Sequence, residues 1–146
     1  CVIRWASEDG HVEVVKVLIS DSRVDPSDRD NEAILLASKN GHAEIVKVLL
    51  SDSRVDPSAR DNYAIRSACE KGRVEVVKVL LSDSRVDPSY CVMIASENGH
   101  AEVVKVLLAD FRVDPSMGGR APLRVACEEG HANVIKVLLS DSRVVK

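Results

Sequence analysis

Aromatic side chains are scarce in this chain of 146 residues, where they make up 3% of the sequence. This excludes an aromatic core, so the core must come from Val, Leu, Ile and Ala. Apolar residues make up 45% and charged residues 29% of the chain, as in an ordinary soluble globular protein. A chain of this length can bury a sizeable core within a single domain.

The sequence also lacks an excess of positive charge and any long apolar run. Its formal net charge is −3, with basic and acidic residues interspersed, which excludes the basic surface typical of nucleic-acid binding. No apolar run approaches the ~20 residues that a membrane-spanning helix needs, and no secretory signal opens the sequence. We therefore predict neither a nucleic-acid nor a membrane partner.

Metal-binding cysteine motifs are missing as well. The four cysteines, Cys1, Cys69, Cys91 and Cys127, form no CxxC pair and no Cys/His cluster with zinc-ligand spacing. This pattern predicts small buried side chains in a reducing compartment, and hence an intracellular, cytoplasmic protein. We predict no metal and no cofactor.

What the sequence has instead is repetition. The octapeptide SDSRVDPS begins at Ser20, Ser51 and Ser82, returns as ADFRVDPS at Ala109, and ends the chain as SDSRVVK. Glycines recur with spacings of 31, 31, 27 and 31 residues, at Gly10, Gly41, Gly72, Gly99 and Gly130. A period of this size indicates a solenoid of stacked units. We divide this single domain, a segment of a longer array, into five copies: residues 1–27, 28–58, 59–89, 90–116 and 117–146.

Each copy contains two apolar segments with helical periodicity. The second segment of the first copy reads HVEVVKVLIS, with polar residues Glu13, Lys16 and Ser20 spaced three and four apart. They form one stripe on a helix, whereas a strand would place Glu13 and Lys16 on opposite sides. The first segment, for example NYAIRSACEKG, also has a helical apolar face. Each copy is therefore predicted to be helix, turn, helix and loop.

The ends of these helices follow from the same sequence. The recurring glycine suits a left-handed C-terminal cap between the two helices, and the proline of SDSRVDPS prevents the second helix from continuing. The predicted N-caps of two first helices are Asn31 or Asp30, and Asn62 or Asp61.

These residues resemble the ankyrin repeat. The last copy, APLRVACEEGHANVIKVLL, keeps the Pro-Leu pair, the helix alanine and the Gly-His step of the family pattern, and the other copies keep parts of it. The resemblance implies an all-α solenoid of stacked helix pairs with loops on one side, a concave surface and protein binding without catalysis. The copies are shorter than the usual repeat of about 33 residues, so we expect blunt finger loops without regular β-hairpins.

The repeated polar residues invite chemical explanations that the spacing does not favour. His11, His42, His100 and His131 recur at one position, but equivalent positions in a solenoid lie about 10 Å apart, too far to share a metal. We expect a structural role for them, with bonds to the backbone near the turn between the helices. SDSRVDPS lacks EF-hand spacing, so we expect it to join the copies. Its arginine recurs beside its second aspartate, as Arg23 does beside Asp25, and we expect neighbouring loops to share such charge pairs. Phosphorylation stays an alternative at Ser20, Ser51, Ser82 and Ser140.

Positions that differ between the copies are the better candidates for a specific surface, although drift without function would also produce such variation. The resemblance places the partner on the fingers and first helices. The predicted partner-binding residues are Glu32, Leu35, Lys39, Asn40, Arg60, Tyr63, Arg66, Glu70, Lys71, Tyr90, Met93, Glu97, Asn98, Arg120, Arg124 and Glu128.

The 27-residue spacing has one location. VDPSARDNYAIRSAC of the third copy becomes VDPSYCVMIAS in the fourth, so ARDN is missing before Tyr90 and Ser89 becomes the predicted N-cap. This predicts a notch in the row of fingers between the third and fourth copies. The notch either receives a partner side chain or is a tolerated loop deletion, and the sequence favours the second.

The leading hypothesis is a non-enzymatic module that binds a protein partner through its concave face. The alternative is a structural spacer or scaffold segment of a longer array that self-associates end to end.

Overall fold

The computed structural model describes residues 2–144, except for the side chains of residues 118–120. These residues form ten α-helices and no strand, as the all-α prediction requires. The first helices of the five copies are α1 (Val2–Asp9), α3 (Asp28–Asn40), α5 (Ala59–Lys71), α7 (Cys91–Glu97) and α9 (Met117–Glu128). The second helices are α2 (Val12–Ile19), α4 (Ala43–Leu50), α6 (Val74–Leu81), α8 (Ala101–Leu108) and α10 (Ala132–Ser140).

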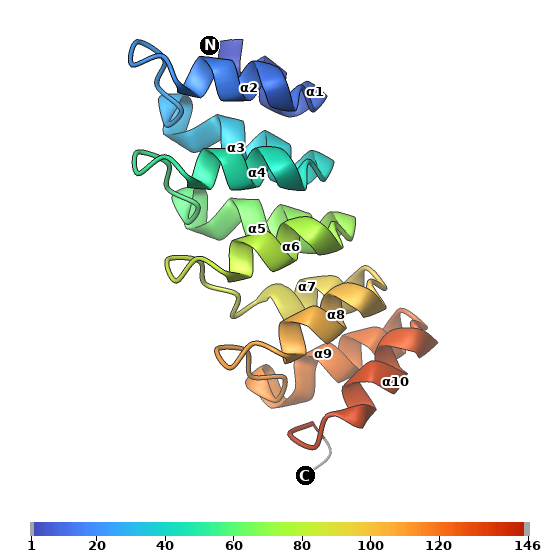
Figure 1. Cartoon of the computed structure of the whole chain (residues 1–146). Helices are drawn as coiled ribbons and strands as arrows, with labels where there is room; N and C mark the ends of the chain where they lie inside the picture. Colours follow the sequence, from blue (N-terminus) through green and yellow to red (C-terminus); the bar gives the residue numbers. More distant parts are fainter. Residues whose placement is uncertain (1, 145–146) are drawn as a thin grey trace.

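The helix pairs stack in chain order, so each pair contacts the pairs before and after it (Figure 1). First helices pack against first helices and second helices against second helices, which gives two layers. The loops that follow the second helices project to one side of the stack. The helix–turn–helix prediction is confirmed, and the part of the chain that the structure describes has no β-hairpin in its fingers.

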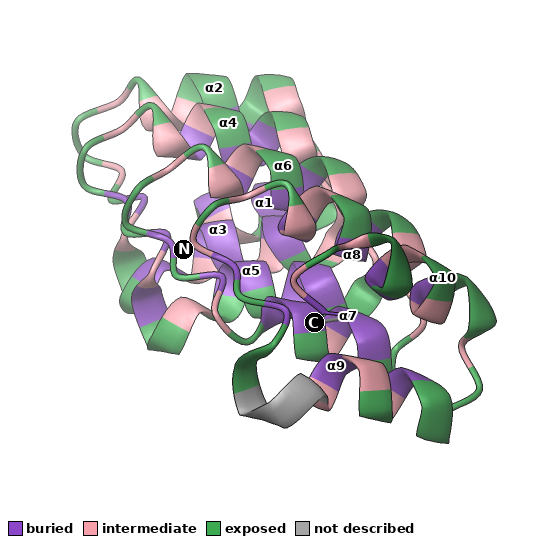
Figure 2. Cartoon of the chain, turned by 90° about the horizontal axis from the view of Figure 1, so that it is seen from below, coloured by how far each residue is buried: buried purple, intermediate pink, exposed green. Residues whose placement is uncertain are grey.

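The core lies between the two layers and is aliphatic. Figure 2 shows its buried positions as a band along the inner faces of the helices. The second helices bury residues such as Ile45 and Leu49, and the first helices bury residues such as Ile34 and Ile65. Val55, like its counterparts in the next two copies, reaches this core from the SDSRVDPS segment. Because the copies share one core, each pair of helices depends on its neighbours for burial.

The turn between the helices has the predicted glycine cap. Gly41 has a φ of +83°, and the amide of His42 donates to the carbonyl oxygen of Ala37 at 2.9 Å. This bond closes the end of α3 in the manner of a Schellman cap. A residue with a Cβ is strained at this φ, which explains why glycine recurs here.

The start of α3 and α5 differs from the prediction. Three consecutive residues have left-handed backbone angles in each, namely residues 29–31 and 60–62, with φ between 54° and 63°. The Oδ1 of Asn31 accepts a hydrogen bond from the backbone amide of Asp56 at 2.7 Å, in the SDSRVDPS segment that ends the same copy, and does not cap its own helix. Asn62 makes the same bond to Asp87 at 2.8 Å. The two asparagines that were predicted as caps therefore connect the start of the first helix to the end of the same copy.

The missing ARDN removes this left-handed turn from the fourth copy. Its first helix, α7, begins at Cys91 and has 7 residues, whereas α5 has 13. Tyr90 occupies the N-cap position and makes no side-chain cap bond, so the prediction that Ser89 is the N-cap is wrong. The hydroxyl and amide of Ser89 instead donate to the carboxylate of Asp87.

Candidate functional site

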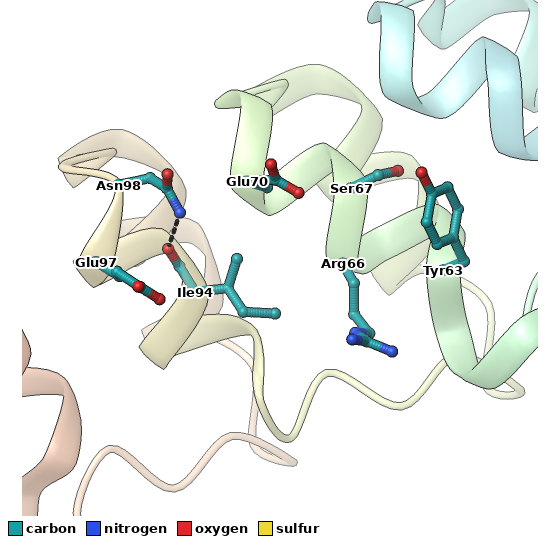
Figure 3. A pocket seen from close by; sticks show the side chains of 7 residues that line it. All are labelled: Tyr63, Arg66, Ser67, Glu70, Ile94, Glu97 and Asn98. Carbon is teal, nitrogen blue, oxygen red and sulfur yellow. Dashed lines mark hydrogen bonds between the residues drawn. The ribbon is translucent and has the colours of Figure 1, made fainter.

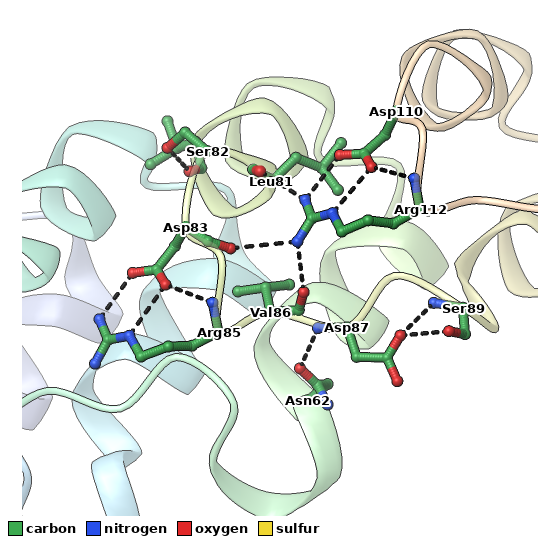
Figure 4. Close-up of polar contacts among 11 residues, drawn as sticks. Asn62, Leu81, Ser82, Asp83, Arg85, Val86, Asp87, Ser89, Asp110 and Arg112 are labelled. Carbon is green, nitrogen blue, oxygen red and sulfur yellow. Dashed lines mark hydrogen bonds and ion pairs between the residues drawn. The ribbon is translucent and has the colours of Figure 1, made fainter.

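The SDSRVDPS segments, which we call the joint loops, connect consecutive copies (Figure 4). Arg112 pairs with Asp110 through two bonds, Nε to Oδ1 at 3.0 Å and Nη2 to Oδ2 at 2.7 Å. It also donates to the carbonyl oxygens of Val86 and Leu81, both at 2.7 Å, in the preceding copy. The same arginine-to-valine bond joins three further pairs of loops at 3.0 Å: Arg54 to Val24, Arg85 to Val55, and Arg143 to Val113.

The two aspartates of each joint loop have different partners. The arginine binds the first aspartate, as in the pair Arg112–Asp110, so the predicted pairing with the second aspartate is corrected. The second, Asp114, accepts bonds from the amide and hydroxyl of Ser116 at 2.9 and 2.6 Å. Hydrogen bonds from Arg112 lower the pKa of Asp110, and those from Ser116 lower the pKa of Asp114. Both carboxylates therefore stay charged while they hold the loop.

The recurring histidines form a second row of contacts between copies. The Nε2 of His42 donates to the carbonyl oxygen of Glu8 at 3.0 Å, and the Nε2 of His131 donates to the backbone carbonyl oxygen of Glu97 at 2.9 Å. Arg73 replaces histidine in the third copy, and its Nε donates to the carbonyl oxygen of Lys39 at 3.2 Å. The structural role predicted for these side chains is confirmed. Within residues 2–144, no group of His, Cys, Asp and Glu side chains could hold a metal ion.

The cysteines differ in exposure. Cys69 and Cys91 are buried free thiols, as predicted, but Cys127 is exposed, which corrects the prediction for that residue. A hydrogen bond with Cys91, together with burial, raises the pKa of the Cys69 thiol. Cys69 is therefore kept as an unreactive thiol at neutral pH. Cys1 lies outside the described residues.

The predicted notch is present between α5 and α7. Between the second and third copies, Arg60 of α5 covers the left-handed turn of α3 by donating to the carbonyl oxygen of Arg29 at 2.7 Å. Because α7 has no such turn, Asp61 and Asn62 of α5 border a cavity of about 330 Å³ instead. This cavity is lined by Asp61, Asn62, Arg66, Asp87, Tyr90, Met93 and Ile94.

A second cavity of about 330 Å³ continues along the same two helices (Figure 3). It is lined by Tyr63, Arg66, Ser67, Glu70, Ile94, Glu97 and Asn98. Arg66 and Ile94 line both cavities, so the two form one groove between α5 and α7, which we call the notch. A smaller cavity of about 70 Å³ lies beyond Tyr90 and Met93, toward Met117 and Pro122 of α9.

The structure brings together a part of the predicted partner-binding set. The members that line the notch are Tyr63, Arg66, Glu70, Tyr90, Met93, Glu97 and Asn98. Leu35 is 2% exposed and packs in the core, so its assignment to a surface is corrected. The side chain of Arg120 lies outside the described residues.

The remaining predicted residues lie away from the notch or contribute to the stack. Glu32 pairs with Arg4 at 3.4 Å, and the amide of Asn40 donates to the carbonyl oxygen of Glu8 at 3.2 Å. Four others are exposed: Lys39, Lys71, Arg124 and Glu128. Arg60 belongs to the turn contact described above.

Sequence reasoning missed several notch residues and one loop residue. Ile94, Ser67, Asp61, Asn62 and Asp87 line the cavities but were not in the predicted set. Phe111 is 94% exposed in the fourth joint loop, where other copies have serine. Its departure from an otherwise constant motif was the signal that could have identified it.

The comparison with protein families agrees with the helix pairs, the glycine caps and the stacking. A family described as ankyrin repeats (3 copies) matches residues 3–90 and again residues 67–146. No curated protein sequence matches the chain. No helix among residues 2–144 has both the length and the apolar character that crossing a bilayer requires. The two family matches together cover residues 3–146, and the chain belongs to the ankyrin repeat family.

Proposed function

We propose that this chain is a non-enzymatic protein-interaction module that binds its partner through the concave face, formed by the first helices and finger turns. Ankyrin repeats are generally protein–protein interaction modules. The observation that carries the proposal is that the repeated residues and the variable residues have different places in the structure. The repeated arginines and histidines are used in bonds between copies, whereas exposed side chains that differ between copies gather around the notch.

A few large, exposed side chains around the notch are available as anchors for a partner. Tyr63 and Tyr90 are 39% and 63% exposed, and Met93 is 37% exposed. Aromatic and arginine side chains supply most of the binding free energy in many interfaces. Arg66 lies between these residues on α5. Selectivity would thus come from a small group of side chains on two adjacent copies.

The test is selection of a displayed library of random peptides on the whole chain, followed by affinity measurements on variants. Tyr63→Ala and Met93→Ala are expected to weaken binding about tenfold each, equivalent to ~1.4 kcal/mol. The matched controls are Glu44→Ala and Lys47→Ala on the second-helix layer, which pair with each other on the surface at 2.8 Å. If the control variants lose as much affinity as the concave ones, the proposed face is wrong.

The scaffold alternative has an observation of its own. Val14 of α2 is 47% exposed, whereas its counterparts Ile45, Val76 and Val103 are at most 1% exposed because another copy covers them. Trp5 and Val17 on the same end are 54% and 70% exposed. We propose as a second candidate function that this end stacks on another copy of the chain. Sedimentation velocity would show association that rises with concentration and is lost in Val14→Lys; a concentration-independent monomer would contradict it.

A further inference from the structure

We propose that the notch is a docking site for a partner segment that presents an arginine or lysine side chain next to an apolar side chain. The inference rests on the proposed function and assigns it a place and a partner chemistry. It concerns the groove between α5 and α7, whose two cavities share Arg66 and Ile94.

The notch exists because a contact between copies is missing. The turn at residues 29–31 is covered by Arg60, through bonds to the carbonyl oxygen of Arg29 at 2.7 Å and to Asp30 at 3.4 Å. The turn at residues 60–62 has no such cover, since α7 starts directly after Tyr90. Each resulting cavity, at about 330 Å³, is within the usual size range of ligand pockets, about 300–1,000 Å³.

The charges around the notch favour a cation. Its lining includes four carboxylates, Asp61, Glu70, Asp87 and Glu97, and a single basic side chain, Arg66. The guanidinium of Arg66 is already paired with Asp61, Nη1 to Oδ2 at 3.2 Å. An incoming anion would therefore meet mainly other anions, whereas an incoming cation would meet acceptors.

Two of these carboxylates are well placed for a partner. Across the described chain, Glu97 has no ion pair. It lines the same cavity as Glu70, which belongs to the neighbouring helix α5 (Figure 3). Glu70 has only the adjacent Lys71, at 3.5 Å and on the surface, and such exposed pairs are weak. A guanidinium or ammonium between Glu70 and Glu97 would form charge-assisted bonds to both.

The rest of the notch suits the alkyl part of such a side chain and an apolar neighbour. Ile94 is half-buried where the two cavities meet, and Tyr63 stands at the edge of the cavity that contains Glu97. Aliphatic stems of Lys and Arg pack on such surfaces while their charged ends stay hydrated. Beyond Ile94, the exposed Tyr90 and Met93 border both the cavity lined by Asp61 and the small apolar one near Met117. The basic side chain is thus assigned to the cavity of Glu97 and the apolar one to that of Met93.

The experiment is selection of random dodecapeptides displayed on phage against the whole chain, followed by calorimetric titration of the enriched synthetic peptides. We expect the enriched peptides to share an arginine or lysine near an apolar residue. The double variant Glu70→Gln/Glu97→Gln should weaken their affinity at least about tenfold, and higher salt should weaken binding to the original chain. The matched control, Glu44→Gln/Glu75→Gln, removes two exposed carboxylates from the second-helix layer and should leave affinity unchanged.

Several outcomes would overturn the proposal, and they separate it from the proposed function. Enriched peptides without a basic residue, or equal affinity for the Glu70→Gln/Glu97→Gln variant, would overturn the notch chemistry. If such peptides instead lose affinity in Lys39→Ala or Arg124→Ala, the concave face binds elsewhere and only the notch proposal fails. Binding that no concave variant changes would overturn both. If only the notch proposal fails, the absence of ARDN from the fourth copy is a loop deletion without a binding role.

Discussion

The Nη1 of Arg112 donates a hydrogen bond of 2.7 Å to the carbonyl oxygen of Val86, in the joint loop one copy earlier. The carboxylate of Asp110 fixes the guanidinium in place for this bond. Three further arginine–valine pairs make the same connection. The repetition of SDSRVDPS is therefore explained by stacking, since every copy needs the same bond to its neighbour.

Replacing Arg112 tests the role of this connection. Arg112→Ala removes five bonds, to Asp110, Val86, Leu81 and the carbonyl oxygen of Asp83. We expect it to lower the free energy of unfolding by about 2 kcal/mol, as for hydrogen bonds to charged groups. The measurement is urea unfolding followed by circular dichroism. Arg23→Ala is the control, because Arg23 has the same bond to its aspartate but no bond to a preceding loop among the described residues. A loss as large in Arg23→Ala would contradict the account.

Two glycines separate backbone strain from crowding. Gly99 and Gly130 have nearly equal φ values, +75° and +74°, but a Cβ at Gly99 would lie 2.8 Å from the ring of His131, whereas a Cβ at Gly130 would meet nothing within 4 Å. Both alanine variants bear a left-handed cost of about 1–2 kcal/mol. Gly99→Ala should lose about 1 kcal/mol more, since it displaces His131 from its bond to Glu97. Thermal and urea unfolding measure the two losses of stability. If Gly99→Ala and Gly130→Ala lose the same free energy of unfolding, the histidine contact contributes nothing.

Buried serines in the first helices offer a stabilising change. Ser38 is buried, and its hydroxyl has no hydrogen-bond partner among the described residues. Ser38→Ala removes this unpaired group and is expected to raise the free energy of unfolding by about 1 kcal/mol. Ser67 is the control, since its buried hydroxyl donates to the carbonyl oxygen of Ala64 at 3.1 Å, and Ser67→Ala should give no such gain. A loss of stability in Ser38→Ala would indicate that its hydroxyl is paired.

The joint loops predict a fall in stability at acid pH. Hydrogen bonds from Arg85 and Arg112 lower the pKa of Asp83 and Asp110 in the folded chain. A lowered folded pKa stabilises the fold above the unfolded value, and this contribution is lost as pH falls through the folded pKa. Stability should therefore change little from pH 7 to about pH 5 and decrease below about pH 4.

Urea unfolding at a series of pH values measures this decrease. Asp110→Asn should be less stable than the original chain at neutral pH and should lose less on acidification, because one of the titrating groups is gone. An acid decrease of the same size in this variant would exclude Asp110 as a contributor.

Much of the stack could be predicted from sequence because it depends on local patterns. Gly99 and its counterparts end helices wherever they occur, and the spacing of residues such as Glu13 and Lys16 requires a helix. The turn at residues 60–62 could not be predicted in this way. Its residues have left-handed angles, and the Oδ1 of Asn62 accepts a hydrogen bond from the amide of Asp87, 25 residues further along the same copy. An argument from adjacent residues alone predicts an ordinary N-cap instead.

The candidate site was predicted in part for similar reasons. The missing ARDN is visible in the sequence, and it predicts a notch before Tyr90. The column of variable residues also contains Leu35, whose burial depends on how α3 packs. The arginine of each joint loop has an aspartate two residues away on either side, so its choice of Asp110 over Asp114 required the folded loop. Spacing alone does not distinguish such alternatives.

The central claim is that variable residues of the notch, and not the repeated joint loops, contact the partner. Hydrogen exchange with and without a selected basic peptide tests it most directly, because exchange reports protection segment by segment. The account predicts slowed exchange in residues 59–71 and 90–98, which form both sides of the notch, with the joint loops at residues 20–27, 51–58 and 109–116 unchanged. Protection confined to the joint loops or to the second helices would contradict it.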